Sequence, residues 1–568
     1  MTHEAPAKPA RLKPPPYGHR TASTADTREL TVTGPPPALG HCTQIDAATA
    51  QPGSTEQIGL WAASQRADAL LCKENRSCLG TSRRAQEGIQ QVRVSHAISP
   101  VFDDPNLVSC TGLAPVVALA ERCGLHELVA NTLTLSGEGS AYAEVKIPAL
   151  VAGMIAGADS IDDMDLLRHG GMGRLFDQVR APSTLGTFLR TFTFGHVRQL
   201  DAIAARLLVD LAAHTPLLPD ADQVCFIDID DTVKQTYGYT KQGAGYGYSG
   251  VKGLNALIAV VSTPTSAPVI AATRLRKGKV NSARGAARLV TDALKVTQNI
   301  RKQSASKGHG KSHGKDAGSG PGSGLVLVRM DSAFYTADVV AAARRSGAKV
   351  SITARMNKAV TAAITGIEET AWTPIKYPHA IWDDDEQRWI SDAEVAEVDY
   401  TAFTSRTKAM HATGRLIVRR VRRLNPGADP QGELFAAYRY HAVFTDSSLE
   451  LLQAESYHRG HAVIEQVHAD LKSGPLAHLP SASFAANSAW LVLAAMAFNL
   501  TRAAGALASM FHARATTATI RTQLISVPGR IASSARRQTL HLPRDWPWEQ
   551  AWQNMAAGAL GPPHSRAA

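Results

Sequence analysis

The sequence predicts an α/β protein in which a helical region precedes a sheet. Apolar residues recur at helical spacing from Pro105 to about His214, which is the pattern of packed amphipathic helices. Runs rich in Val, Ile and Leu follow at 224–230, 254–262 and 268–276, and such runs bounded by turn residues are typical of strands. Three strands in succession predict an antiparallel meander.

The elements after the meander indicate the type of core. A helix is expected at about Ser282 to Arg301, and LVLVRMD at 325–331 reads as a fourth strand that ends in an aspartate. The order strand, strand, strand, helix, strand is that of a ribonuclease-H-like core. Residues 302–324, KQSASKGHGKSHGKDAGSGPGSG, are predicted to form a basic low-complexity loop because they have nothing to bury.

Length and charge indicate several domains and a polyanionic partner. At about 100 to 200 residues per domain, a chain of 568 residues suggests roughly three domains. The 60 Lys and Arg residues exceed the 49 Asp and Glu residues, so the net charge is +11, which favours nucleic acid as a partner.

Cysteine usage and hydropathy indicate the compartment. The six cysteines show no CxxC spacing and no secretory segment is recognisable at the N-terminus, so we expect reduced thiols in a cytoplasmic protein. The longest apolar segment, Trp490 to Leu500, is well short of the about 20 residues that cross a bilayer. We therefore predict a buried helix there and no membrane association.

Changes in composition divide the chain into six segments. The first is rich in Pro, Ala, Thr and Gln with weak periodicity, as in disordered chains. The fourth contains alternating, strand-like stretches at 414–426 and 436–446, and its arginines fit either a DNA backbone channel or a solvated edge strand. The predicted segments are a disordered or misassigned leader (1–95), a helical, DNA-binding domain (105–215), a first part of the core (222–355), a β-rich insertion (356–446), a second part of the core (447–545) and a C-terminal tail (546–568).

The segment APSTLGTFLRTFTFGHVRQLDAIAARLL at 181–208 allows two interpretations. Its basic and polar side chains among apolar ones would suit a helix-turn-helix-like unit on DNA, with Arg190 and Arg198 as DNA contacts. An ordinary helical layer would have the same pattern. The helical region is the candidate for recognition of a specific DNA sequence.

Three aspartates close the first strand in CFIDIDDT at 225–232. A strand that ends in D-x-D-x-T is also the nucleophile motif of haloacid-dehalogenase-type phosphatases, in which Asp228 would attack phosphorus and Asp230 would act as acid and base. Such enzymes need a later strand that ends in paired acids. The candidate, HAIWDDDEQRW at 379–389, has no long hydrophobic strand before its acids, so the phosphatase is the weaker interpretation.

Carboxylates at strand ends also suit phosphoryl transfer with two Mg²⁺ or Mn²⁺ ions, because these cations prefer oxygen ligands. One aspartate must then bridge both ions. Asp331, after LVLVRM, is placed to supply a second ligand because its strand is expected beside the first one in a ribonuclease-H-like sheet. A cap on the following helix is the alternative role for Asp331.

A third acidic element is YHRGHAVIEQVHADLK at 457–472. Its apolar residues form a helical stripe, and Glu465 lies off that stripe. Lys472 follows seven residues later, two helical turns on and therefore on the same face as Glu465. With Tyr457 and Arg459 just upstream, this surface combines one metal ligand with several phosphate contacts.

These motifs together resemble the bacterial insertion-sequence DDE transposases that carry a Tyr-Arg-Glu-Lys signature, and within them the insertion-sequence 1380 group. The resemblance covers roughly residues 105–545. The matching stretches are APSTLGTFLRTFTFGHVRQL, DIDDT, RMDSAFY, YHRGHAVIEQVHADLK and FAANSAWLVLAAMAFNL.

The resemblance implies the transposase of a transposable element, which binds the terminal inverted repeats of its insertion sequence, cleaves both ends and joins them to target DNA. Its catalytic and metal-binding residues correspond to Asp230, Asp331 and Glu465, with two Mg²⁺ or Mn²⁺ ions. Asp228 stays an alternative to Asp230, because strand alternation places both on one face. An inactive relative that only binds DNA is a further alternative.

The resemblance also implies DNA contacts and partners. Tyr457, Arg459 and Lys472 correspond to the residues that contact phosphates of the transposon end. The common signature has two residues between Tyr and Arg and three between Arg and Glu. In this sequence one residue separates Tyr457 from Arg459 and five separate Arg459 from Glu465. This departure affects the role assigned to Arg459 more than those assigned to Glu465 and Lys472. A homodimer is expected in the synaptic complex, in the cytoplasm of a bacterium and associated with its nucleoid.

Overall fold

The computed structural model describes residues 98–176, 178–237, 240–308, 324–375, 382–383, 388–389, 393–422, 438–534 and 537–561. The chain divides into two units, 1–99 and 100–568. The predicted leader at 1–95, most of the predicted loop at 302–324 and most of the acidic stretch at 379–389 lie outside the described residues.

The N-terminal part of the second unit is helical, as the apolar spacing predicts. Its interior is filled by leucine, valine, isoleucine and phenylalanine side chains of successive helices. These elements are strand β1 (Leu107–Val108) and helices α2 (Leu113–Arg122), α3 (Leu125–Thr132), α4 (Ala143–Ala156), η1 (Asp162–Leu167), α5 (Met172–Leu175), α6 (Pro182–Arg190) and α7 (Phe194–His214).

The strands that follow form one mixed sheet. They and their helices are β2 (Val224–Gln235), β3 (Gly245–Tyr246), β4 (Lys252–Ser262), β5 (Val269–Lys277), α8 (Ala286–Gly308), β6 (Leu325–Met330), η2 (Ser332–Phe334), α9 (Ala337–Arg345) and β7 (Lys349–Thr353). Strand β4 pairs antiparallel with β2 and β5, which confirms the meander, and β6 lies parallel to β2 and β7. The resulting order β5-β4-β2-β6-β7 is compatible with a ribonuclease-H-like core. Helix α8 continues to Gly308, so the predicted loop is wrong over 302–308.

The β-rich stretch expected at 356–446 continues this sheet rather than standing apart from it. Strand β13 pairs with β7, and β12, β11 and β8 follow in order. The far edge of β7 is thereby covered. The elements are α10 (Lys358–Thr365), η3 (Glu369–Ala371), β8 (Thr373–Ile375), β9 (Trp382–Asp383), β10 (Arg388–Trp389), β11 (Ala393–Ala402), η4 (Lys408–Met410), β12 (Ala412–Arg422) and β13 (Tyr438–Thr445).

The C-terminal part is helical again and returns to the N-terminal helices. Its elements are α11 (Leu451–Arg459), η5 (Gly460–Ala462), α12 (Val463–Lys472), α13 (Phe484–Ala508), α14 (Met510–Arg514), α15 (Thr517–Ile520), η6 (Arg521–Ile525), β14 (Gly529–Ser534), β15 (Arg537–His541) and α16 (Glu549–Leu560). Strand β14 pairs with β1 and β15. Helix α16 buries Ala551, Met555 and Ala559 and packs against α2 and α13. The segment expected as a C-terminal tail at 546–568 thus contains this helix, whose apolar residues recur at helical spacing and have a partner surface.

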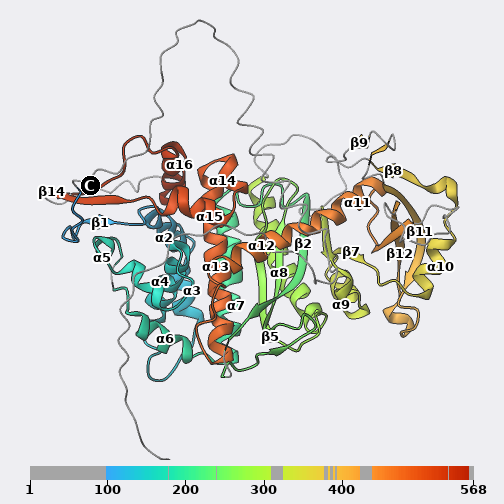
Figure 1. The fold of residues 1–568 in the computed structure, drawn as a ribbon, viewed down its shortest axis with the longest axis horizontal. Helices are drawn as coiled ribbons and strands as arrows, with labels where there is room; N and C mark the ends of the chain where they lie inside the picture. Colours follow the sequence, from blue (N-terminus) through green and yellow to red (C-terminus); the bar gives the residue numbers. More distant parts are fainter. Residues whose placement is uncertain are drawn as a thin grey trace, which may run out of the picture. The chain divides into compact units, whose positions relative to one another are not determined.

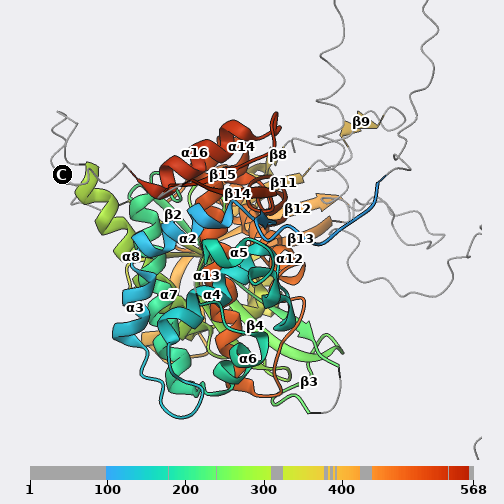
Figure 2. The same ribbon diagram turned by 90° about the vertical axis from the view of Figure 1, so that its left-hand side faces the viewer.

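Helix α13 is the central helix of the unit. It packs against α4, α7 and α16 and against strand β5, as Figure 1 and Figure 2 show. The buried helix predicted at 490–500 is confirmed and extends over 25 residues. By length and composition alone this helix could cross a membrane, but 89% of its apolar window is buried inside the protein, which is the pattern of a core helix.

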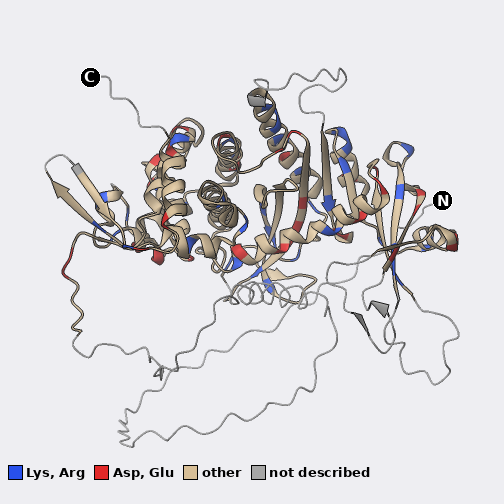
Figure 3. Ribbon diagram, turned by 90° about the horizontal axis from the view of Figure 1, so that it is seen from above, with Lys and Arg blue, Asp and Glu red and all other residues tan. Residues whose placement is uncertain are grey.

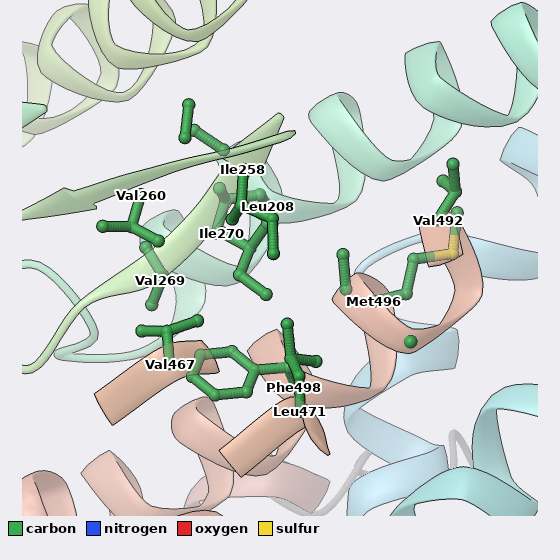
Figure 4. Close-up of a cluster of buried hydrophobic side chains, with 14 of the residues drawn as sticks. Leu208, Ile258, Val260, Val269, Ile270, Val467, Leu471, Val492, Met496 and Phe498 are labelled. Atoms are coloured by element: carbon green, nitrogen blue, oxygen red, sulfur yellow. The ribbon is translucent and has the colours of Figure 1, made fainter. Parts of the chain in front are cut away.

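The helix is tied to the sheet by apolar packing and by one amide. Figure 4 shows Phe498 of α13 close to Val467 and Leu471 of α12, with residues of β4 and β5 on the other side of the cluster. The Asn499 side chain accepts from the Ile270 backbone N–H at 2.8 Å and donates to its carbonyl oxygen at 2.8 Å. This amide satisfies two backbone polar groups of β5.

Candidate active site

The aspartates of the first strand lie inside β2 rather than at its end. Strand β2 continues to Gln235 because β4 stays paired with it up to Gly253. The parallel neighbour β6 leaves earlier, since its last paired residue, Met330, lies opposite Ile229. Asp230 is thus the first residue of β2 with no β6 residue beside it in the ladder.

Asp228 is fully enclosed. Its side chain is 0% exposed, and both carboxylate oxygens accept from Arg329, at 2.6 Å from Nε and 2.7 Å from Nη2. The His461 Nδ1 atom lies 3.2 Å from the same carboxylate. Burial is the largest influence and opposes ionisation, but the charge of Arg329 and the hydrogen bonds from His461 and Arg329 together outweigh it and hold the pKa of Asp228 below its usual value. A carboxylate held in this way has no lone pair directed at a ligand in solution.

Asp231 faces the opposite side of the strand. Its carboxylate accepts from Asn255 Nδ2 at 2.6 Å and forms an ion pair with the buried Arg276. Alternation along β2 places it away from Asp228 and Asp230. Of the three aspartates, Asp230 is therefore the one that is available for chemistry.

Asp230 is partly buried and lacks a strong cationic partner. Its side chain is 17% exposed, and Oδ1 accepts from the backbone N–H of Asp231 at 2.7 Å. Burial raises the pKa of Asp230 to about 6, although the nearby His468 lowers it. The charge of Asp331 raises it further, so these two predicted acids are electrostatic neighbours.

Asp331 combines the two roles that the sequence allows. It follows β6 directly and forms the N-cap of η2, where Oδ1 accepts from the Ala333 backbone N–H at 2.9 Å. Burial raises its pKa. One oxygen is therefore engaged as a cap, while the residue stays beside Asp230.

Glu465 reaches the same place from helix α12. Its side chain is 57% exposed, and the adjacent His468 holds its pKa below the usual value. Among the described residues, Asp230, Glu465 and His468 each offer an atom within 4.8 Å of the others. Two of the three predicted catalytic acids thus converge, and Asp331 stands outside this group.

Histidines of this helical segment, which were not among the predicted site residues, also lie at the site. His458, His461, Glu465, His468 and Lys472 are spaced by three, four, three and four residues, which is the spacing of one helical face. This spacing is visible in the sequence and would have been enough to predict that the histidines lie near Glu465.

Helices α11 and α12 are separated by a short break at Gly460 that allows close packing. A Cβ atom at this position would lie 2.8 Å from Nη1 of Arg329, and that guanidinium donates to the Tyr457 carbonyl oxygen at 2.6 Å. The stretch 457–472 therefore belongs to two helices, with Tyr457 and Arg459 on the first and the predicted apolar stripe on the second.

Helix α12 is held firmly at its base. Ile464, Val467 and Leu471 are each 1% exposed, which confirms the predicted apolar stripe. After the helix, Trp490 Nε1 donates to the carbonyl oxygen of Pro475 at 2.6 Å. Because these contacts fix the helix against α13, the position of Glu465 relative to β2 is set by the core.

The predicted phosphate contacts are dispersed. The Tyr457 ring packs edge to face on Phe226 at 4.8 Å between centroids, and Arg459 pairs with Glu455 at 2.8 Å. Lys472 is exposed near Glu465. Lys234, two positions after Thr232 on the same face of β2 as Asp230, has a pKa lowered by burial and by the charge of Lys472. The structure thus adds a second lysine near Lys472.

The predicted DNA contacts of the helical region differ from one another. Arg190 ends α6 and is exposed, with a hydrogen bond to Thr187 Oγ1 at 2.9 Å. Arg198 pairs with Asp201 at 2.6 Å and with Asp292 of α8 at 3.3 Å, so a phosphate would compete with two carboxylates there. Helix α7 packs against α3, α8 and α13, as in an ordinary helical layer.

Arginines of the β-rich stretch face acids across strands. Arg415 pairs with Glu397 at 2.5 Å, and Arg420 pairs with Glu394 at 2.6 Å. The Arg420 guanidinium also lies over the rings of Trp372 and Tyr438, at 4.3 and 4.5 Å. Figure 3 shows both signs of charge interspersed over the ribbon. These contacts favour the salt-bridged interpretation for the two arginines, while Arg423 lies outside the described residues.

The C-terminal part of the chain is similar to a known protein family. Residues 319–559 match the family model described as transposase DDE domain group 1. The match supports a DDE transposase. It includes Asp331, Glu465 and helix α13, and it begins after strand β2. No curated protein matches the chain.

The phosphatase interpretation is not favoured beside the transposase. Its nucleophile would be Asp228, whose two oxygens are both bound by Arg329 in the protein interior. A nucleophile needs a free lone pair and room for the phosphate. A DDE transposase instead needs carboxylates from separate elements, as Asp230 and Glu465 are.

Proposed function

We propose that this DDE transposase acts on the ends of an insertion sequence. It binds the terminal inverted repeats, cleaves the ends and joins them to target DNA. The observation that carries the proposal is the meeting of Asp230 from β2 with Glu465 from α12, within the 4.8 Å group. The match of residues 319–559 to a transposase DDE domain supports cleavage and joining of DNA as the reaction in which these carboxylates act. The finer assignment to the insertion-sequence 1380 group and its signature is part of the proposal.

The donor atoms suit divalent cations. Asp230 and Glu465 would hold one ion, and Asp230 and Asp331 a second, as Mg²⁺ or Mn²⁺. Carboxylate oxygens are the ligands that these cations prefer, and the carboxyl of Asp230, whose pKa burial raises to about 6, gains most from a cation nearby. When bound, two such ions activate the attacking oxygen and stabilise the leaving oxygen of an in-line displacement.

The residues of the chain have separate tasks in this scheme. Arg329 fixes Asp228 and the Tyr457 carbonyl oxygen, which ties β2, β6 and α11 into one frame for the acids. Lys472, near Glu465, and Lys234, near Lys472, would contact phosphates of the transposon end, as would Tyr457. In the first step water displaces the 3′ oxygen of a phosphodiester at the element end. The freed 3′-hydroxyl then displaces a 3′ oxygen in target DNA, so no covalent enzyme intermediate is required.

Recognition of the repeats is assigned to the helical segment at 105–215. Exposed Arg190 on α6 is the candidate contact there, whereas Arg198 would first have to leave Asp201 and Asp292. Since both ends of the element are joined in one complex, the proposal includes a homodimer. Residues 222–355 and 447–545 would form the catalytic core.

The test is a cleavage assay with the element's own flanking DNA. Labelled duplexes that contain the inverted repeats are incubated with the full chain, with Mg²⁺ or with EDTA. Glu465→Gln and Asp331→Asn should abolish cleavage at the repeat boundary. Glu450→Gln, at an exposed glutamate before α11, is the matched control and should cleave like the wild type.

Three results would contradict the proposal in different ways. Binding of the repeats without metal-dependent cleavage would indicate an inactive relative. Hydrolysis of a small phosphomonoester without any response to DNA would return the assignment to the phosphatase. Cleavage that survives Glu465→Gln would show that the acids are assigned wrongly.

A further inference from the structure

His468 stands between the two carboxylates that converge in the candidate site. Its side chain is 5% exposed, and it lies on α12 one turn beyond Glu465. The Nδ1 atom is 3.7 Å from Oδ2 of Asp230 and 3.8 Å from Oε2 of Glu465. The imidazole therefore faces both acids from the buried side of the helix.

The two distances from His468 Nδ1 fit atoms that bind the same metal ion better than atoms joined by a hydrogen bond. An N–H···O hydrogen bond spans about 2.7 to 3.2 Å between heavy atoms, and both distances are longer. Two ligands bonded to one ion at about 2.1 Å can lie up to about 4.2 Å apart, and both distances fall below that limit. The carboxylates, within 4.8 Å of each other, need only a small movement of the exposed Glu465 side chain to share the ion.

The other two histidines of the segment have partners at shorter distances. His461 Nδ1 lies 3.2 Å from Asp228, and His458 lies 2.9 and 3.1 Å from the hydroxyls of Ser351 and Thr353. His468 differs, since its Nε2 is buried without a hydrogen-bond partner among the described residues. A buried imidazole without such partners is costly, and a ligand at Nδ1 would offset part of this cost.

We infer that His468 Nδ1 is the third protein ligand of the cation held by Asp230 and Glu465. This inference rests on the proposed function and deepens it, because the site then offers one nitrogen and two carboxylates. Mg²⁺ prefers oxygen ligands, whereas transition-metal cations accept imidazole readily. The site should consequently favour Mn²⁺ over Mg²⁺ more than a site built from carboxylates alone.

The experiment uses Mn²⁺ alone as the probe, with the full chain and without DNA. Electron paramagnetic resonance measures bound Mn²⁺ in titrations and in competition with Mg²⁺, and electron spin-echo modulation reports a directly bonded ¹⁴N. The wild type should show ¹⁴N modulation. His468→Asn, which keeps a polar atom near the position of Nδ1, should bind Mn²⁺ without that modulation and lose about tenfold in Mn²⁺ affinity.

Two controls separate the possible results. His461→Asn should keep the modulation, because that imidazole belongs to Asp228, and Asp230→Asn should lose the bound Mn²⁺. Bound Mn²⁺ without ¹⁴N modulation in the wild type would overturn the His468 ligand and leave the acids of the proposed function intact. Failure of the wild type to bind Mn²⁺, or binding that Asp230→Asn does not affect, would overturn this inference together with the proposed metal site.

Discussion

Asp228 and Asp230 stand two residues apart on one face of β2, yet their replacement by asparagine should have opposite effects on stability. Asp228→Asn removes the negative partner of Arg329, whose side chain is only 4% exposed. Leaving one charge of a buried pair without its partner costs about 3 to 5 kcal/mol. Asp230→Asn instead removes a carboxylate that burial disfavours.

The size of the second effect follows from the pKa of Asp230. A rise from 3.8 to about 6 corresponds to roughly 3 kcal/mol at about 1.4 kcal/mol per unit, as an upper bound. Because the folded protein holds more protons than the unfolded chain between about pH 4 and pH 6, the metal-free wild type loses stability as pH rises through that window. Asp230→Asn should therefore stabilise the metal-free protein above pH 6 and have little effect below pH 4.

Thermal unfolding followed by circular dichroism in EDTA at pH 7.5 measures both effects. At about 2 to 4 °C per kcal/mol, Asp228→Asn should lower Tm by on the order of 10 °C and Asp230→Asn should raise it by several degrees. Asp399→Asn, at an exposed aspartate of β11, is the control and should stay within about 0.5 kcal/mol of the wild type. Shifts of equal sign for the two β2 aspartates would refute the reasoning.

Three further predictions concern the frame around the site. Asn499→Ala leaves the backbone N–H and carbonyl of Ile270 unpaired and should lower the free energy of unfolding by about 2 to 4 kcal/mol; an unchanged urea midpoint would contradict this. Gly460→Ala places a Cβ against Arg329, which Asp228 and the Tyr457 carbonyl oxygen hold in place, and should cost about 1 to 3 kcal/mol; an unchanged Tm would contradict this. Burial lowers the pKa of His458 to about 3, so the wild type should lose about 1.4 kcal/mol per pH unit below pH 6.5. His458→Gln should flatten that profile, and parallel profiles would count against a buried neutral imidazole.

Local patterns were sufficient for the helices before β2 and for the first strands of the sheet. Apolar spacing gave the helices before β2, and runs of β-branched residues between turns gave the strands and the meander. The stripe on α12 was also readable, because side-chain burial repeats with the helical period. Even the overlooked histidines lie on that period beside Glu465.

Long-range pairing was not readable in the same way. The pairing of β13 with β7 depends on strands that are distant in sequence. The helix at 549–560 likewise depends on the distant surfaces of α2 and α13 against which it packs. The length of β2 beyond Asp230 also depends on a partner, since β4 stays paired after β6 has left.

The choice between Asp228 and Asp230 shows the same difference between what the sequence determines and what the tertiary structure determines. The sequence by itself determined that both acids share one face of a strand and that Glu465 lies on a helix with Lys472. Only the tertiary structure decided that Arg329 would fill the space at Asp228 and that His468 would lie between Asp230 and Glu465. The reason is physical: periodicity along a chain fixes the direction of each side chain relative to its own element, whereas burial and charge pairing depend on which distant elements pack against it.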